Sequence, residues 1–179
     1  FDTPQRKREL LDRLVDEQLI LDANDKLGAT VPPARIQEVI NSHAELGRML
    51  FKSLAQLFED LRDFAVYEDD DGNVIGCCAL TIIWADLSEV RSLAVDEASR
   101  GRGIGRQLVE WCIREARRLG IRKLMSLTYE QRFFEKLGFE VVPKEALPLK
   151  VWSDCVRCPK RDGCDEIAMV RTLEDVAVI

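Results

Sequence analysis

Long apolar runs and an excess of positive charge are both missing from this sequence. No apolar stretch approaches the roughly 20 residues that a membrane-spanning helix needs, so we expect no membrane span. Acidic residues outnumber basic ones, 32 to 26, and the formal net charge of -6 argues against nucleic acid as a partner. The opening stretch, residues 1–6, is charged from its second position, so we expect no signal peptide and a cytoplasmic protein.

Histidine is nearly missing as well, with one residue, whereas cysteine is present six times. Because no secretion signal accompanies them, these cysteines indicate reduced thiols or a metal clip more than disulfides. Apolar residues make up 46% of the 179 residues, which is enough for a packed core. This length predicts one domain with an appendage.

A glycine- and arginine-rich loop is the most informative stretch of the chain. It covers residues 100–105, between a predicted strand that ends at Val95 and an amphipathic helix of about residues 106–119. Glycines at alternate positions leave backbone N–H groups uncovered, and the positive end of the helix dipole adds to them. The loop also concentrates positive charge on three side chains, Arg100, Arg102 and Arg106. Together these features predict a pyrophosphate-binding loop.

Two other phosphate-binding loops fit the pattern less well. A P-loop needs a lysine and then a serine or threonine after its last glycine, whereas Arg106 and Gln107 follow Gly105 here. A dinucleotide-binding fingerprint needs the spacing G-x-G-x-x-G, and this loop has G-x-G-x-G. Both alternatives are therefore set aside.

At this loop the chain resembles the GNAT acetyltransferase superfamily. The acetyl-CoA signature of that superfamily, Arg/Gln-x-x-Gly-x-Gly/Ala, is matched by Arg100, Gly103 and Gly105. A second stretch, residues 133–139, resembles the late helix of the superfamily and the strand after it, and the whole resemblance covers about residues 34–142. It implies acetyl-CoA as co-substrate. The residues implied to bind it, at the strand end and in the loop, are Leu93, Ala94, Val95, Arg100, Gly101, Arg102, Gly103, Ile104, Gly105 and Arg106.

The resemblance and the hydrophobic periodicity predict the same fold class, α/β (α+β), with a mixed, mostly antiparallel sheet flanked by helices. The expected helices cover residues 5–27, 33–47, 53–63 with Ser53 as N-cap, and 106–119. The expected strands cover residues 64–68, 74–83, 88–95, 123–128, 139–142 and 166–172, the first two joined by an acidic turn at 69–73. The superfamily normally begins with a strand, and the helix at 5–27 takes its place here.

The N-terminal part is interpreted as a helical appendage, residues 1–33, on an acetyltransferase domain at 34–179 that includes a cysteine-rich segment at 152–165. Residues 5–21 resemble the N-terminal helical segment of SurA-like prolyl-isomerase chaperones. No isomerase domain follows, so no isomerase activity is implied. A helix that packs on the domain, or on a second copy in a homodimer, is the simplest interpretation, and a fusion or graft is the alternative.

A closer resemblance lies upstream of the loop and concerns the acceptor. Residues 47–53, 76–80 and 88–95 are similar to the acetyltransferase domain of bacterial N-acetylglutamate synthases. In that family a basic residue before the second helix grips the amino-acid carboxylate, and a glutamate early in the central strand is the general base. Lys52 and Glu89 match these positions, and a solvated loop lysine is the alternative interpretation of Lys52. The resemblance implies a stand-alone amino-acid N-acetyltransferase, with L-glutamate as the small-molecule substrate and a place in arginine biosynthesis.

Strand geometry supports these roles from the residues themselves. Because side chains alternate along a strand, we expect one side to present a common set: Glu89, Arg91, Leu93 and Val95. Glu89 then takes a proton from the acceptor amine through one water, or it is only a surface carboxylate. The N–H of Leu93 polarises the acetyl carbonyl, while Val95 pairs with the pantetheine amides. Arg91 binds an acceptor carboxylate or neutralises Glu89, and the superfamily resemblance implies that this strand bulges and splays.

The proton donor to the CoA thiolate is marked less clearly. The superfamily often uses a tyrosine in the late helix, and that position is Phe134, which cannot donate. Tyr129 is the nearest hydroxyl and the candidate, unless the thiolate leaves without an acid. Two other functions stay open: transfer to another small amine or a protein N-terminus, and a non-catalytic acyl-CoA-binding or assembly module.

A cysteine cluster near the C-terminus is the last motif, formed by Cys155, Cys158 and Cys164. The C-x2-C spacing is typical of zinc knuckles, and Cys164 would supply a third thiolate ligand. The fourth ligand is open, because the only histidine, His43, is distant in sequence. A zinc site, a disulfide and reduced thiols are the three interpretations. The other three cysteines lie in apolar segments and are predicted to be core residues.

Overall fold

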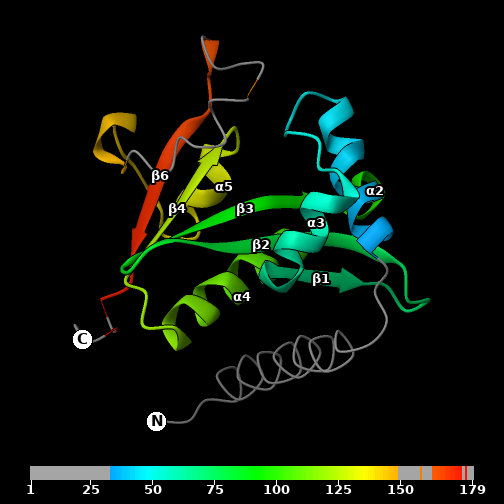
Figure 1. The fold of residues 1–179 in the computed structure, drawn as a ribbon, viewed down its shortest axis with the longest axis horizontal. Coiled ribbons are helices and arrows are strands. Elements are labelled where there is room, and N and C mark those ends of the chain that lie inside the picture. Colours follow the sequence, from blue (N-terminus) through cyan, green and yellow to red (C-terminus); the bar gives the residue numbers. More distant parts are fainter. Residues whose placement is uncertain (1–32, 149–157, 159–162, 175, 177–179) are drawn as a thin grey trace.

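The computed structural model describes residues 33–148, 158, 163–174 and 176 (Figure 1). The predicted helix at 5–27 and the SurA-like resemblance of that stretch lie outside these residues. None of the helices in the described ranges has both the length and the apolar character of a membrane span.

One six-stranded sheet forms the centre of the described fold, with the strand order β1-β2-β3-β4-β6-β5. Its strands are β1 Phe64–Glu68, β2 Val74–Trp84, β3 Leu87–Val95, β4 Lys123–Thr128, β5 Glu140–Val141 and β6 Ile167–Thr172. Neighbouring strands are antiparallel except β3 and β4, which are parallel. The predicted mixed, mostly antiparallel sheet is therefore confirmed.

Helices cover both faces of this sheet (Figure 1). They are α2 Pro33–Glu45, α3 Leu54–Asp60, α4 Ile104–Arg118 and α5 Gln131–Glu135. On one face, buried side chains of α4 pack with Cys78 and Leu80 of β2. On the other face, α2 and α3 pack with Cys77 and Ala79 of the same strand. Because β2 is covered on both sides, its first seven residues are buried without the alternation of a half-exposed strand.

Local capping explains where α3 and α4 begin. The hydroxyl of Ser53 accepts a hydrogen bond from the Gln56 N–H at 3.2 Å, and Gln56 Oε1 accepts one from the Ser53 N–H at 2.9 Å. This reciprocal pair is a capping box, and it confirms Ser53 as the N-cap. Helix α4 begins at Ile104 rather than at the predicted residue 106, because Gly103 adopts a φ of 83° and is itself the N-cap.

Gly76 lets α4 lie close to the sheet. A Cβ at this position would stand 3.0 Å from Ile104 Cγ2 and 3.2 Å from Leu108 Cδ1, closer than side chains ordinarily pack. Gly76 also pairs with Val95 at the end of β3. The contact therefore holds the first turn of α4 beside the end of β3, and so positions the loop that joins them.

Gly76→Ala is expected to lower the free energy of unfolding by about 1–3 kcal/mol, because the added methyl overpacks the contact with Ile104 and Leu108. The matched control is Gly105→Ala, whose Cβ would meet Phe133 at an ordinary 3.5 Å. That substitution is expected to be neutral or to stabilise the helix by up to about 1 kcal/mol. Urea unfolding of both variants measures the difference, and an unchanged Gly76→Ala would contradict this account of the packing.

Candidate active site

Strand β3 carries one extra residue where it pairs with β2. Cys77 pairs with Ala94 and Ala79 pairs with Arg91, so two residues of β3 oppose one residue of β2 between these pairs. Ser92 lies in this bulge with a φ of 53°, the one positive φ of a non-glycine residue in the described part of the chain. Such a bulge bends the strand and takes backbone groups out of the regular ladder. The bulged strand that the superfamily resemblance implies is therefore present.

The bulge reverses which side chains share a face of β3. Before it, Glu89 and Arg91 lie with their β2 partners on the face that α2 and α3 cover. After it, Leu93 and Val95 pack on the α4 side. The expectation that these four residues share one side is therefore wrong. Strict alternation requires a regular ladder, and the extra residue at Ser92 changes the parity.

Two adjacent thiols of β2 bind the carbonyls of this bulge. Cys77 Sγ donates to the carbonyl of Ser92 at 3.6 Å, and Cys78 Sγ donates to that of Arg91 at 3.7 Å. Burial raises the pKa of Cys77 to about 12 and also raises that of Cys78, so both thiols keep the protons that they donate. Both are fully buried, as is Cys112, which confirms the prediction that these cysteines are core residues.

Strands β3 and β4 pair only near their first residues. The parallel pairing joins residues 87–89 of β3 to residues 123–125 of β4. Directly beyond it, the Ser126 hydroxyl donates to the carbonyl of Val90 at 3.1 Å. From there the two strands separate, as the ribbons in Figure 1 show. In the later part of β3, Ala94 and Val95 pair with β2, and residues 93–95 have no ladder partner on β4.

The glycine-rich loop lies between β3 and α4. A short 3-10 helix, η2 Glu97–Ser99, leads into it, and Gly101 and Gly103 have φ angles of 78° and 83°. A Cβ on either glycine would meet nothing within 4 Å. Because Gly103 is the N-cap of α4, the first N–H groups of that helix have no intrahelical partner. Open space beside unpaired N–H groups at a helix start fits a pyrophosphate.

The two motifs of the superfamily resemblance meet in space. A Cβ on Gly105 would lie 3.5 Å from Phe133 of α5 and 3.7 Å from Val95 of β3. Phe133 packs edge-on against Phe134, with ring centroids 5.2 Å apart, and Phe134 is buried in the core. The position at which the superfamily often has a tyrosine is thus a core position here. Tyr129, the predicted proton donor, directly follows β4 and is half-buried.

The predicted acceptor residues lie on the side of the sheet that α2 and α3 cover. Glu89 is 9% exposed, and its Oε2 lies 3.9 Å from Nε of Arg91. Lys52 Nζ lies 2.5 Å from Asp60 Oδ2 and 5.9 Å from the centre of the Phe64 ring. Because the Lys52 side chain is only 13% exposed, its ammonium is a paired and mostly buried charge.

Asp63 belongs to this group, although no sequence motif marks it. Its Oδ2 accepts a hydrogen bond from Thr81 Oγ1 at 3.1 Å. Burial raises the pKa of the Asp63 carboxyl, and the Thr81 hydrogen bond opposes this. Among nearby charges Asp60 raises the same pKa, whereas Arg91 and Lys52 lower it. Arg91 and Lys52, which are far apart in sequence, therefore act on one carboxyl.

Helix α2 holds the backbone of Lys52 in place. Gln37 Nε2 donates to the Lys52 carbonyl at 2.8 Å, and the Lys52 N–H donates to Asn41 Oδ1 at 3.2 Å. Both amides lie one helical turn apart on α2, so the segment before α3 is fixed at two points. Neither residue is marked by a motif, because an amide on a helix is most often a solvated side chain.

The predicted zinc ligands are only partly described. Cys158 and Cys164 are half-buried, and Cys155 lies outside the described residues. Cys164 Sγ donates to Glu166 Oε2 at 3.8 Å. Within the described ranges, no group of three or more histidine, cysteine, aspartate or glutamate residues is arranged to hold a metal ion. The described part of the chain therefore gives no support to the zinc interpretation.

Comparison with known proteins defines the class to which this fold and site belong. A model of the GNAT acetyltransferase domain matches residues 60–141. An uncharacterized N-acetyltransferase of Chlorobaculum tepidum is 44% identical over 138 residues, which are 77% of this chain and 88% of that protein. The amino-acid acetyltransferase of Mycobacterium tuberculosis is 35% identical over 125 residues, which are 68% of this chain and 71% of that protein.

Solved structures agree with these relatives. The N-acetylglutamate synthase of Neisseria gonorrhoeae, complexed with coenzyme A and N-acetyl-glutamate, is 30% identical with a TM-score of 0.70, covering 79% of this chain and 32% of that chain. A Mycobacterium tuberculosis protein solved in complex with CoA is 29% identical with a TM-score of 0.68, covering 79% and 93%. The chain belongs to the GNAT acetyltransferase superfamily. It is an N-acetyltransferase that uses acetyl-CoA, which favours the enzyme over the non-catalytic alternative.

Gly103→Ala is expected to weaken CoA binding about 10-fold or more, since a methyl enters the open space of the loop and a positive φ costs roughly 1–2 kcal/mol. Gly72→Ala is the matched control, because Gly72 has a φ of 79° and open space around it but lies in the β1–β2 turn. Calorimetric titration with CoA gives the affinity, and thermal unfolding gives the stability. Equal affinities of the two variants would contradict the role of this loop.

Proposed function

We propose that this enzyme transfers the acetyl group of acetyl-CoA to the α-amine of L-glutamate, in arginine biosynthesis. The observation that carries the proposal is the grouping of one candidate base with two cations on one face of the sheet. Glu89 lies beside Arg91, and Lys52 Nζ lies over the ring of Phe64, whose β2 partner Ala79 also pairs with Arg91. Glutamate has one amine and two carboxylates, so its site needs a base and at least two positively charged donors. The similarity to amino-acid acetyltransferases supports the same acceptor class.

We assign acetyl-CoA to the end of β3 and to the glycine-rich loop. The separation of β3 from β4 supports this assignment, because residues 93–95 then have backbone positions next to an unpaired side of the strand. The proposed cofactor-binding residues are Leu93, Ala94, Val95, Arg100, Gly101, Arg102, Gly103, Ile104, Gly105 and Arg106.

The proposed chemistry is a direct transfer without an acyl-enzyme. Acetyl-CoA supplies an acetyl thioester. The ammonium of the amino acid gives a proton to Glu89 through a water, and the neutral amine attacks the thioester carbon while the N–H of Leu93 donates to the carbonyl oxygen. An N–C bond forms and the C–S bond breaks. The new amide nitrogen releases its second proton to water, and the CoA thiolate takes a proton from Tyr129 or from water.

Both cations of the proposed acceptor site already have acidic neighbours. Three carboxylates surround the two cations, so the local charge is not strongly positive; the five groups are Glu89, Asp60, Asp63, Lys52 and Arg91. A substrate carboxylate must therefore join an existing network of ion pairs. This arrangement makes the comparison of glutamate with less charged acceptors the decisive measurement.

The experiment that tests the proposed function is release of CoA thiol from acetyl-CoA with a panel of acceptors. The panel contains glutamate, glutamine, aspartate, leucine, a polyamine and a short peptide with a free N-terminus. We expect the largest kcat/KM for glutamate. If glutamate is ignored at millimolar concentration, or if the peptide or polyamine is preferred, the glutamate assignment fails while the N-acetyltransferase class stands.

Glu89→Gln is expected to lower kcat by about 100-fold or more, because the amide keeps the shape and removes the proton acceptor. The affinity for CoA should stay within about twofold, since Glu89 lies before the bulge and apart from the loop. Glu140→Gln on β5 is the control, an exposed glutamate away from β3. Turnover at the wild-type rate in a folded Glu89→Gln enzyme would show that this carboxylate is not the base.

Lys52→Met is expected to raise the KM for glutamate by about 10- to 100-fold, the loss of one charge-assisted contact, with little change for acetyl-CoA. Methionine keeps the apolar stem of the buried side chain. This change leaves the Asp60 carboxylate without its cation, which is itself destabilising. The double variant Lys52→Met, Asp60→Asn removes that unpaired charge, so a KM that stays raised in it reports the loss of substrate binding.

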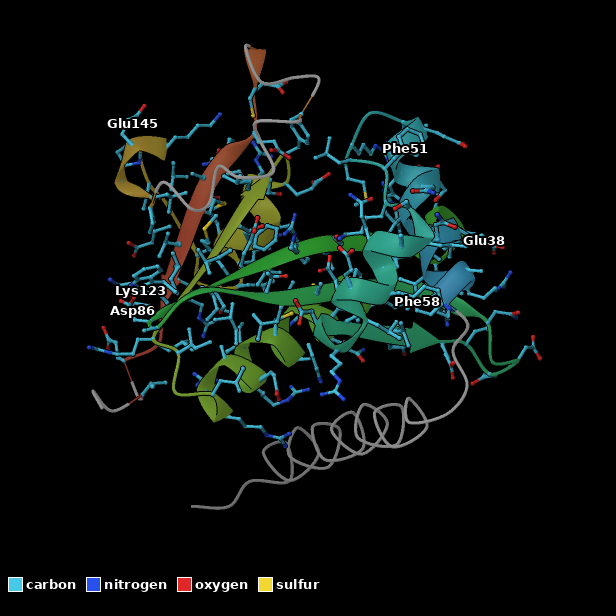
Figure 2. All side chains as sticks on the ribbon, in the orientation of Figure 1. Glu38, Phe51, Phe58, Asp86, Lys123 and Glu145 are labelled. Atoms are coloured by element: carbon cyan, nitrogen blue, oxygen red, sulfur yellow. The ribbon has the colours of Figure 1, made fainter. Side chains whose placement is uncertain are left out.

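The control for Lys52 is Lys123→Met. Lys123 also pairs with an aspartate, Asp86, at 3.4 Å, and Figure 2 shows this pair at the end of the sheet away from α2 and α3. An equal rise in KM for both lysine variants would indicate a general charge effect. A normal KM in the double variant would remove Lys52 from the acceptor site.

A further inference from the structure

The only histidine of the chain joins α2 to the glycine-rich loop. His43 is 6% exposed, and its Nε2 lies 3.1 Å from Nη2 of Arg100. Arg100 is the first residue of the acetyl-CoA signature, and 57 positions separate it from His43. A buried imidazole in contact with this arginine has no part in the function described above.

The partners of the ring define its tautomer. A guanidinium only donates hydrogen bonds, so Nε2 of His43 must accept from Arg100 and carries no proton. The proton is then on Nδ1, which donates to the carbonyl of Val39 at 3.0 Å. The same carbonyl accepts from Ser42 Oγ at 2.8 Å. Helix α2 therefore holds a neutral imidazole with its acceptor nitrogen against Arg100.

The other contacts of Arg100 are weaker constraints. Arg100 Nη1 lies 3.8 Å from Glu97 Oε1, which is also 3.6 Å from Arg48 Nη1. The Glu97 side chain is 68% exposed, so solvent screens this pair. The contact with His43 is shorter and is made to a buried group. It occupies one of the five guanidinium N–H donors, which leaves the others for an anion.

We propose that His43 is a positioning residue for acetyl-CoA, which holds the guanidinium of Arg100 in the orientation that binds the pyrophosphate. This inference rests on the proposed cofactor role of Arg100. A fixed guanidinium loses less conformational freedom on binding than a mobile one, so the hydrogen bond increases affinity without touching the cofactor.

The test is a double-mutant cycle with CoA as the probe, measured by calorimetric titration on the full chain. His43→Phe keeps the ring and removes the acceptor, and we expect it to weaken CoA binding about 10-fold. His43→Gln should recover most of the affinity. In the Arg100→Ala background, His43→Phe should have no further effect, because His43 acts through Arg100. The KM for the acceptor should change by less than about twofold in the His43 variants. A general structural defect would change this KM as well, so the measurement distinguishes it from a positioning role.

The outcomes distinguish a failure of the positioning role of His43 from a failure of the cofactor role of Arg100. If Arg100→Ala weakens CoA binding but a folded His43→Phe binds normally, the positioning role is wrong and the cofactor loop stands. If His43→Phe weakens binding equally with and without Arg100, its effect is structural and the inference is overturned. If Arg100→Ala itself binds CoA normally, the assignment of Arg100 to the cofactor fails, and the inference fails with it. None of these outcomes in CoA binding depends on whether glutamate is the acceptor.

Discussion

The pairing between β3 and β4 stops at Glu89 and Met125, and the proposed site depends on that interruption. Parallel strands that stay in register would bury the backbone of β3 between β2 and β4. Here the bulge at Ser92 bends β3, while the hydroxyl of Ser126 binds the carbonyl of Val90 directly beyond the last ladder pair. A strand with one unpaired side, leading directly into a helix N-terminus, is what a long cofactor with a phosphate group requires.

Helix α2 makes hydrogen bonds to both the acceptor side and the cofactor side of the proposed site. Gln37 and Asn41 bind the backbone of Lys52, on the proposed acceptor side. Further along the same helix, His43 binds Arg100, on the proposed cofactor side. A displacement of this one helix would therefore move the acceptor lysine and the cofactor arginine together. The helix is anchored in turn by apolar side chains buried against β2 and β3.

Features that depend on neighbouring residues could be read from the sequence. The loop between β3 and α4 is an example, because left-handed backbone at Gly101 and Gly103 is accessible to glycine and disfavoured for other residues. The capping box at Ser53, the strand boundaries and the superfamily itself follow from patterns of the same short range. The roles of Glu89 and Lys52 come from the resemblance, and strand alternation adds only the face on which Glu89 lies.

The sequence by itself thus determined the elements, their order and the glycine-rich loop, since these depend on local backbone preferences and hydrophobic period. Only the tertiary structure decided which side chains share a face. One extra residue at Ser92 places Glu89 and Leu93 on opposite sides of β3. This register shift is defined by pairing with β2, so it cannot be predicted from the local sequence of β3. The contacts of Asp63 with Thr81 and of His43 with Arg100 join distant segments, so they exist only once the sheet and α2 have packed.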